Sequence, residues 1–270
     1  MRKRPLESLF AGPDGRVRFP RVTALVGAGG KTTLMYALAD RMVAAGLRTI
    51  CTTTTKLFPP DAGVPLVLLE GEGDPAEAVR KAWGSASRMV VAWRRLPDVG
   101  KLEGVPPGTV DALADALPEA WLLVEADGAA RKPLKAPAAH EPVFPRRPGC
   151  CVAVVGLDAV GRPLDDAHVH RSALACAVTG QEPGGPVTPG TLARLVAHPE
   201  GLFRGCPPCR RLVFANKADR PGAPEAAFEA AALSLALAPS VEWFAGSAAQ
   251  GWCVPLAGEV AADAWHPALT

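Results

Sequence analysis

The fold is decided by the stretch Val22-Thr23-Ala24-Leu25-Val26-Gly27-Ala28-Gly29-Gly30-Lys31-Thr32-Thr33-Leu34. An apolar, β-branched run ends in three glycines within four residues, and Lys-Thr-Thr then opens an amphipathic segment. This order is typical of a strand, a phosphate-binding loop and a helix, because glycines allow positive φ and a helix start offers free N–H groups. We expect Gly27, Gly29, Gly30, Lys31, Thr32 and Thr33 to bind the nucleotide. Lys31 is also expected to act in catalysis, and Thr32 to ligate Mg²⁺.

The spacing of this loop departs from the common G-x-x-x-x-G-K-[ST] pattern. That pattern requires glycine at position 25, where the chain has Leu25, so the loop is the shorter G-x-x-G-K-T from Gly27 to Thr32. The shorter loop resembles that of the Mur-type ATP-dependent amide ligases. The alternative interpretation is a glycine-rich turn between a strand and a helix that binds nothing.

Composition excludes several classes of function. The 270 residues carry a net charge of +2 with 21% charged residues, so neither nucleic acid nor a membrane surface is expected as a partner. No apolar run approaches a membrane span, and no signal-peptide core is present at the N-terminus. Seven cysteines without a secretion signal indicate reduced thiols in the cytoplasm.

Further along the chain, apolar strand-like runs alternate with helical stretches. This alternation predicts a P-loop NTPase-like α/β fold, doubly wound, with a mainly parallel sheet and helices on both faces. We expect one nucleotide-binding domain over residues 1–270, with a small helical insert at about 165–205. The expected strands are Leu47–Cys51, Val64–Leu69, Met89–Trp93, Trp121–Glu125, Cys150–Val155, Arg211–Ala215 and Val241–Phe244, and the helices include Pro75–Trp83, Thr109–Leu117 and Ala226–Leu237.

Five polar motifs follow predicted strands directly and should meet at the carboxyl edge of the sheet. Among them, Glu125-Ala126-Asp127-Gly128 offers carboxylates that can hold Mg²⁺ or orient an attacking water. We expect Glu125 and Asp127 to be catalytic and Glu125 to bind the metal. The motif also fits the E-x-x-G form of GTPases that assist nickel-enzyme maturation. Ordinary acidic turn residues are the alternative.

The run Thr52–Thr55 places hydroxyl groups at the same edge. Thr54 is expected to coordinate Mg²⁺, and Lys56 to add positive charge. The alternative is that these threonines reflect strand propensity alone.

A third motif, Asn216-Lys217-Ala218-Asp219, matches the N-K-x-D signature of guanine-nucleotide proteins. A carboxylate at Asp219 can accept hydrogen bonds from the two N–H donors of guanine, which adenine does not supply. Ser247-Ala248 follows the next strand, where those proteins place a backbone N–H against the guanine carbonyl. We therefore expect Asn216, Lys217, Asp219 and Ser247 to bind the nucleotide, with GTP favoured over ATP.

Two other features remain open. The charged, proline-rich segment with Arg131, Lys132, Lys135 and Glu141 either clamps a phosphate or anionic substrate or is a solvated surface loop. The pair in Cys206-Pro207-Pro208-Cys209 either binds metal, cycles as a dithiol or is a reduced surface loop. We favour the loop because a structural zinc site needs four ligands. His168 and His170 are expected at the start of a helix.

Several motifs together carry a family resemblance. They are Val26–Thr33, Thr52-Thr53-Thr54 with Lys56, Glu125–Gly128 with Lys132–Pro137, His140-Glu141-Pro142, Gly156–Ala159 and Asn216–Asp219. These residues resemble the YqeC family over about residues 15–250, most specifically in Glu125–Pro142. The Cys206–Cys209 pair is not part of the pattern.

The resemblance implies a role in selenium metabolism, because members of the family are described as accessory proteins of selenium-dependent molybdenum hydroxylases or as selenium cofactor biosynthesis proteins. Together with the motifs, it leads us to expect a Mg²⁺-dependent NTPase that binds GTP or ATP. The expected partner is a client selenium-dependent molybdenum hydroxylase or its cofactor machinery. The alternatives are a nucleotide-dependent ligase with a Mur-like loop and a GTP switch that acts as a metallochaperone-like maturation factor.

Overall fold

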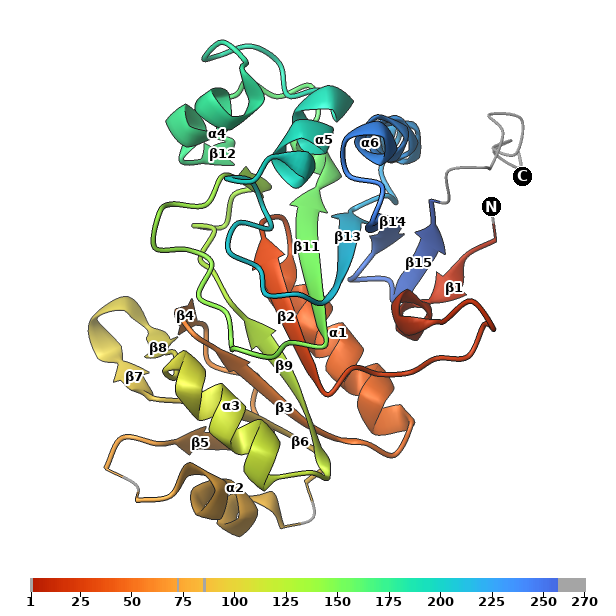
Figure 1. Ribbon diagram of the computed structural model, residues 1–270. Coiled ribbons are helices and arrows are strands. Elements are labelled where there is room, and N and C mark those ends of the chain that lie inside the picture. The colour runs from red at the N-terminus through yellow and green to blue at the C-terminus, as the bar shows by residue number, and fades with distance from the viewer. Residues whose placement is uncertain (1, 72, 85, 257–270) are drawn as a thin grey trace.

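The computed structural model describes residues 2–71, 73–84 and 86–256. Within these residues, ten strands form one large sheet (Figure 1). Eight of them, which are neighbours in the sheet, run parallel to one another. In this sheet, only the pairings of β15, with β14 on one side and with the edge strand β1 on the other, are antiparallel. In spatial order the strands are β1 (Arg4–Pro5), β15 (Trp252–Pro255), β14 (Val241–Ser247), β13 (Arg210–Asn216), β11 (Cys150–Gly156), β2 (Val22–Gly27), β9 (Ala120–Glu125), β3 (Arg48–Thr53), β6 (Arg88–Ala92) and β5 (Leu66–Leu68).

Helices cover both faces of this sheet, which explains why its strands are continuous apolar runs. In β11, Cys150, Val152 and Val154 pack with α1 (Lys31–Ala44) and the 3₁₀ helix η1 (Leu6–Phe10). On the opposite face, the alternate residues of β11 pack with α4 (Ser172–Thr179), α5 (Pro189–Ala197) and α6 (Ala223–Leu237). The helices α2 (Pro75–Trp83) and α3 (Pro107–Ala116) pack with residues of β3, β6 and β9. Figure 1 shows α2 and α3 toward one end of the sheet and α5 and α6 toward the other.

Two small sheets flank the large one. The first is antiparallel and consists of β4 (Lys56–Leu57), β8 (Lys101–Glu103) and β7 (Arg94–Leu96). It lies on the side of the molecule away from β13 and β14 (Figure 1). The second pairs β10 (Leu134–Lys135) with β12 (Val169–His170). The short 3₁₀ helices η2 (Pro97–Val99) and η3 (Leu157–Ala159) complete the named elements.

The α/β class and the mainly parallel sheet predicted from the sequence are confirmed. Helix α2 has the predicted bounds, Pro75–Trp83, and it begins where the Asp74 side chain accepts a hydrogen bond from the Ala76 N–H. The expectation of a helical start at His170 is wrong, because this residue ends β12, whose partner β10 lies far away in the sequence. No helix in the described ranges is both long and apolar enough to cross a membrane.

Candidate functional site

The turn after β2 requires glycine at three positions. Gly27, Gly29 and Gly30 have φ values of 89°, 88° and 125°, a region that other residues rarely adopt. A Cβ on Gly29 would lie 2.4 Å from the backbone nitrogen of Gly156, and one on Gly27 would lie 2.3 Å from the Val154 carbonyl oxygen. The loop therefore packs directly against β11 and its following turn, with no room for side chains.

The backbone N–H groups of the loop fall into two sets. Those of residues 27–29 already donate to protein acceptors, which include a carboxylate oxygen of Asp127 at 2.9 Å from Gly27 N. The first intrahelical bond of α1 runs from Leu34 N to Gly30 O, and within the described residues the amides of residues 30–33 have no acceptor. These four N–H groups lie at a helix N-terminus, where backbone donors and the helix dipole favour an anion.

The Lys31 side chain is buried beneath the loop, between two carboxylates. Its ammonium donates to the Gly27 carbonyl at 2.6 Å and lies 3.1 Å from Asp127 Oδ1 and 3.7 Å from Glu125 Oε1. Burial by itself lowers the pKa of Lys31, but the two carboxylates more than offset this and raise it. The lysine therefore stays charged. Burial has the opposite effect on Glu125 and raises the pKa of its carboxyl group.

The side-chain oxygens of Thr32 and Glu125 lie together beside the loop. The Thr32 hydroxyl donates to Glu125 Oε2 at 2.7 Å, so a hydroxyl and a carboxylate converge where the sequence predicted Mg²⁺. Hard oxygen donors of this kind suit Mg²⁺. The third predicted ligand, Thr54, points elsewhere, because its hydroxyl donates to the Val143 carbonyl. Thr55 lines the cavity instead.

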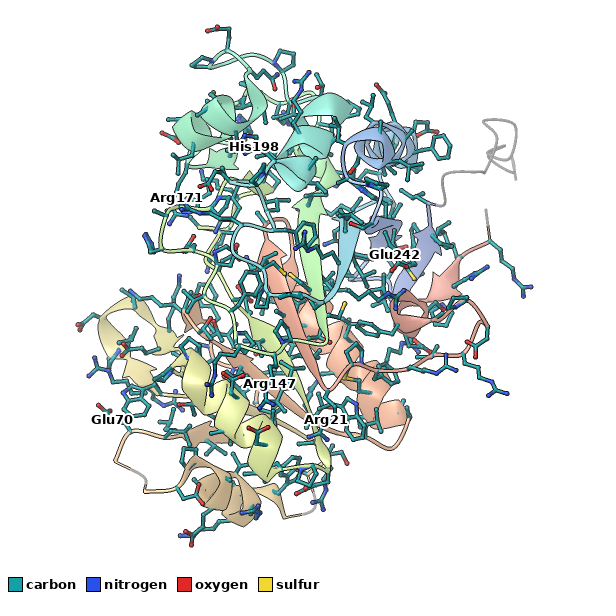
Figure 2. All side chains as sticks on the ribbon, viewed as in Figure 1. Arg21, Glu70, Arg147, Arg171, His198 and Glu242 are labelled. Carbon is teal, nitrogen blue, oxygen red and sulfur yellow. The ribbon has the colours of Figure 1, made fainter. Side chains whose placement is uncertain are left out.

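A second buried lysine, Lys135, lies between the carboxylates of Asp127 and Glu141. Its ammonium lies 3.0 Å from Asp127 Oδ2 and 2.7 Å from Glu141 Oε2, and it also donates to the Gly128 carbonyl at 2.6 Å. Glu141 also accepts a hydrogen bond of 2.5 Å from Arg171, which precedes α4 and lies beside the loop of residues 128–148 (Figure 2). Burial opposes ionisation of Glu141, yet these hydrogen bonds lower its pKa to about 2.

The contacts of Lys135 and Glu141 show whether the charged, proline-rich segment is a solvated surface loop. Lys135 and Glu141 are buried, so this part of the segment is not a solvated surface loop. Arg131 is exposed and remains free to meet a ligand. The acid and base residues Lys31, Glu125, Asp127, Lys135 and Glu141 thus form one continuous charge network beneath the glycine loop of residues 27–30.

The motif Asn216–Asp219 contacts the glycine loop through a hydrogen bond. Asn216 donates from its side-chain amide to the Gly29 carbonyl at 2.8 Å and accepts from the Lys217 and Ala248 N–H groups, each at 2.9 Å. The Ala248 amide expected to face a guanine carbonyl is therefore already bonded. Asp219 is exposed, whereas Ser247 is buried and accepts a 3.4 Å hydrogen bond from the Gln250 N–H. Lys217 forms an ion pair with Asp158 at 2.7 Å.

A cavity of about 980 Å³ opens over this charge network. Seven lysine or arginine side chains line it against three glutamates, so its walls are strongly basic. Residues 29–33 and Lys217 form one side. The rest comes from residues 55–58, Lys101, Glu103, Glu125, residues 128–132, His140, Glu141, Val143, His170 and Arg171. Burial lowers the pKa of His170, which favours the neutral form of that ring at neutral pH.

Comparison with known proteins shows to which family the chain belongs. The family model described as YqeC protein matches residues 23–173. The protein of Escherichia coli (strain K12) described as "Uncharacterized protein YqeC" is 37% identical over 205 residues, which are 75% of this chain and 78% of the relative. The chain belongs to the YqeC family. The segment that matches the YqeC model contains the phosphate loop, Glu125, Asp127, Lys135 and Arg171, whereas Asn216–Asp219 lies beyond it.

The cysteine pair lies outside the YqeC match as well. Cys206 Sγ and Cys209 Sγ are 3.7 Å apart. A hydrogen bond with Cys151 raises the pKa of Cys206 to about 12, so this thiol is held in its protonated, poorly ligating form. Within the described part of the chain, no three His, Cys, Asp or Glu side chains are grouped so that they could hold a metal ion.

Sequence reasoning missed three residues of the cavity, Phe58, Lys101 and Arg171. Phe58 and Lys101 come together through the small sheet of β4, β7 and β8, whose strands are only two or three residues long. Such short strands leave no usable periodicity in the sequence. No sequence motif marked Arg171, because its ion pair with Glu141 depends on the fold that buries Glu141.

Proposed function

We propose that this YqeC-family protein is a Mg²⁺-dependent nucleoside triphosphatase. The observation that carries the proposal is the set of four free N–H groups at residues 30–33, placed beside the charged Lys31 in a basic cavity. A triphosphate carries several negative charges, and such a site offers backbone donors and cations to its oxygens. Neither a bare glycine turn nor a neutral pocket requires these features.

In this proposal each residue has a distinct task. Lys31 and the amides contact the terminal phosphates and stabilise charge on the transferred phosphoryl group. Thr32 and Glu125 hold Mg²⁺, which when bound neutralises charge on the phosphate oxygens. Asp127 acts as a positioning residue, because its carboxylate contacts Gly27 N and both buried lysines. Thr54 would join the metal site only after exchanging its hydrogen bond to Val143.

The proposed nucleotide is GTP, with ATP as the weaker ligand. Support comes from the position of Asn216–Asp219 at the carboxyl end of β13, with the Asn216 side chain hydrogen-bonded to the Gly29 carbonyl of the loop. Asp219 is exposed, so its carboxylate is accessible to a nucleotide base. A site that pairs two guanine donors discriminates strongly against adenine.

The biological setting rests on the family resemblance. We propose that nucleotide hydrolysis assists biosynthesis or insertion of the selenium-containing cofactor of a molybdenum hydroxylase, with that hydroxylase or its cofactor machinery as partner. A nucleotide-dependent ligase is the second candidate, favoured by the short loop and by cavity space beyond it. A ligase would release nucleoside diphosphate only with its acceptor present, whereas a GTP switch would turn over slowly until it met its client.

The experiment is nucleotide binding and turnover with a Lys31→Ala variant. Loss of a charge-assisted contact should weaken triphosphate binding by about 1.5–3 kcal/mol, or about 10- to 150-fold. Lys81→Ala, an exposed lysine on α2, is the matched control and should bind as the wild type does. Circular dichroism would verify that both variants fold. Equal affinity in wild type and Lys31→Ala by calorimetry would refute the phosphate-loop assignment.

A further inference from the structure

The cavity has a second basic region, away from the phosphate loop. We call Lys56, Phe58, Lys101 and Arg131 the distal cluster; its members come from β4, the residue that follows it, β8 and the turn after β9. Lys101 Nζ lies 4.8 Å and the Arg131 guanidinium carbon 4.6 Å from the centre of the Phe58 ring. Two cations from separate segments thus converge on one aromatic side chain.

The cations of the distal cluster lack carboxylate partners. Among the other cavity cations, Lys31 is paired with Asp127, Arg171 with Glu141 and Lys217 with Asp158, whereas Lys132 donates to the Ala167 carbonyl. In the described part of the chain, no ion pair involves Lys56, Lys101 or Arg131. Their charge is therefore not balanced by the protein, and in a concave, partly desolvated site it favours a bound anion.

The backbone at Arg131 is also unusual. Ala130 and Arg131 are consecutive residues with φ of 46° and 60°, although neither is glycine. Such conformations persist where the surrounding structure imposes them, and they concentrate at ligand sites. Here the conformation places the exposed Arg131 guanidinium over the Phe58 ring.

The order of the sheet separates this cluster from the base of the proposed nucleotide. From β2, which carries the phosphate loop, β13 and β14 lie in one direction and β9 and β3 in the other. The guanine-type motif begins at the end of β13, whereas the distal cluster belongs to segments that follow β3, β6 and β9, and β6 lies beside β3. A nucleotide that extends toward Asp219 therefore leaves the distal cluster free, on the side of Thr32 and Glu125, which would hold Mg²⁺.

We propose that the distal cluster is a subsite for a second, anionic small molecule, bound together with the nucleotide. This inference rests on the proposed function for the placement of the nucleotide. The ligand carries carboxylate or phosphate groups, held by Lys56, Lys101 and Arg131, and an apolar part that contacts Phe58. It lies next to the terminal phosphate, in the position of an acceptor substrate.

The test uses the full chain saturated with Mg²⁺ and a non-hydrolysable GTP analogue. The probe is 5-carboxyfluorescein, an aromatic polyanion, followed by fluorescence anisotropy. The double variant Lys101→Ala/Arg131→Ala should weaken probe binding by about tenfold or more. Arg147→Ala is the control, because this exposed arginine pairs with Asp115 beside α3, outside the cavity, and it should bind as the wild type does (Figure 2).

Each outcome has a defined meaning. Displacement of the probe by citrate or by inorganic phosphate distinguishes a carboxylate from a phosphate ligand. Unchanged probe affinity in the double variant, or displacement of the probe by the nucleotide analogue, overturns the inference. If the analogue itself fails to bind, the proposed function fails separately, and titration of the nucleotide-free protein still tests the distal cluster. Unchanged affinity for the analogue in the double variant would verify that its fold is intact.

Discussion

Replacing Lys135 with methionine removes the cation at the centre of the buried charge network. The Lys135 side chain has no exposed surface, and its ammonium contacts carboxylate oxygens of Asp127 and Glu141 at 3.0 and 2.7 Å. Methionine keeps the length and apolar character of the chain but not its charge. The two carboxylates would then share fewer cations in a poorly solvated site, and breaking a buried pair in this way typically costs about 3–5 kcal/mol.

The pKa of Glu141 gives a second measure of this cost. A fall from its ordinary value of 4.5 to about 2 favours the ionised form by about 3 kcal/mol, shared between Lys135 and Arg171. Screening at the cavity edge reduces that figure. The contact with Asp127 adds to the part that Lys135 supplies, so we expect the free energy of unfolding to fall by about 3 kcal/mol or more.

The assay is urea unfolding followed by tryptophan fluorescence. Lys132→Met is the matched control, since its ammonium donates only to the Ala167 carbonyl on the exposed side of the same segment. The control should change the free energy of unfolding by less than about 1 kcal/mol. A Lys135→Met variant as stable as this control would refute the account. Folded Lys135→Met protein should also bind nucleotide more weakly, because Asp127 would hold the Gly27 amide less firmly.

Three further results are expected. Glu125→Gln should slow Mg²⁺-dependent hydrolysis more than it affects folding, and wild-type rates in both this variant and Asp127→Asn would leave neither acid with a catalytic role. Asp219→Asn should shift preference from GTP toward xanthosine triphosphate; if ATP displaces a fluorescent GTP analogue as well as GTP does, Asp219 does not recognise the base. Because the pKa of Glu141 is lowered to about 2, its ionised form contributes stability above about pH 4.5 that is lost as the pH falls toward about 2. In Glu141→Gln, the loss of unfolding free energy between these pH values should therefore be smaller by about 2–3 kcal/mol. An unchanged acid dependence would contradict the ion-pair network.

The large elements of the fold could be predicted because their signals are local. The apolar run before Gly27 forms β2, and the helix after Gly30 begins at Lys31, as the loop pattern requires. Strands buried on both faces read as unbroken apolar runs, so β9, β11 and β13 were found within one or two residues. Their parallel arrangement also brought the predicted polar motifs to one edge of the sheet.

Much of the candidate site depended on contacts between distant segments. The sequence showed Lys135 and Glu141 in a proline-rich segment but not that they are buried, because burial of a charge depends on the partners that compensate it. Likewise, Asn216 matched a base-recognition motif, yet its side chain bonds to Gly29, 187 residues away. No spacing along the chain encodes that contact.

The sequence alone thus determined the strand, the glycine loop, the helix and the parallel sheet around them, since backbone conformation and apolar periodicity are properties of neighbouring residues. The tertiary structure alone decided which charges neutralise one another. It paired Lys31 with Asp127 and left Lys101 and Arg131 over Phe58, through a three-stranded sheet too short to be seen in the sequence. The physical reason is that electrostatic energy depends on distance and solvation in space, and only the folded chain sets these.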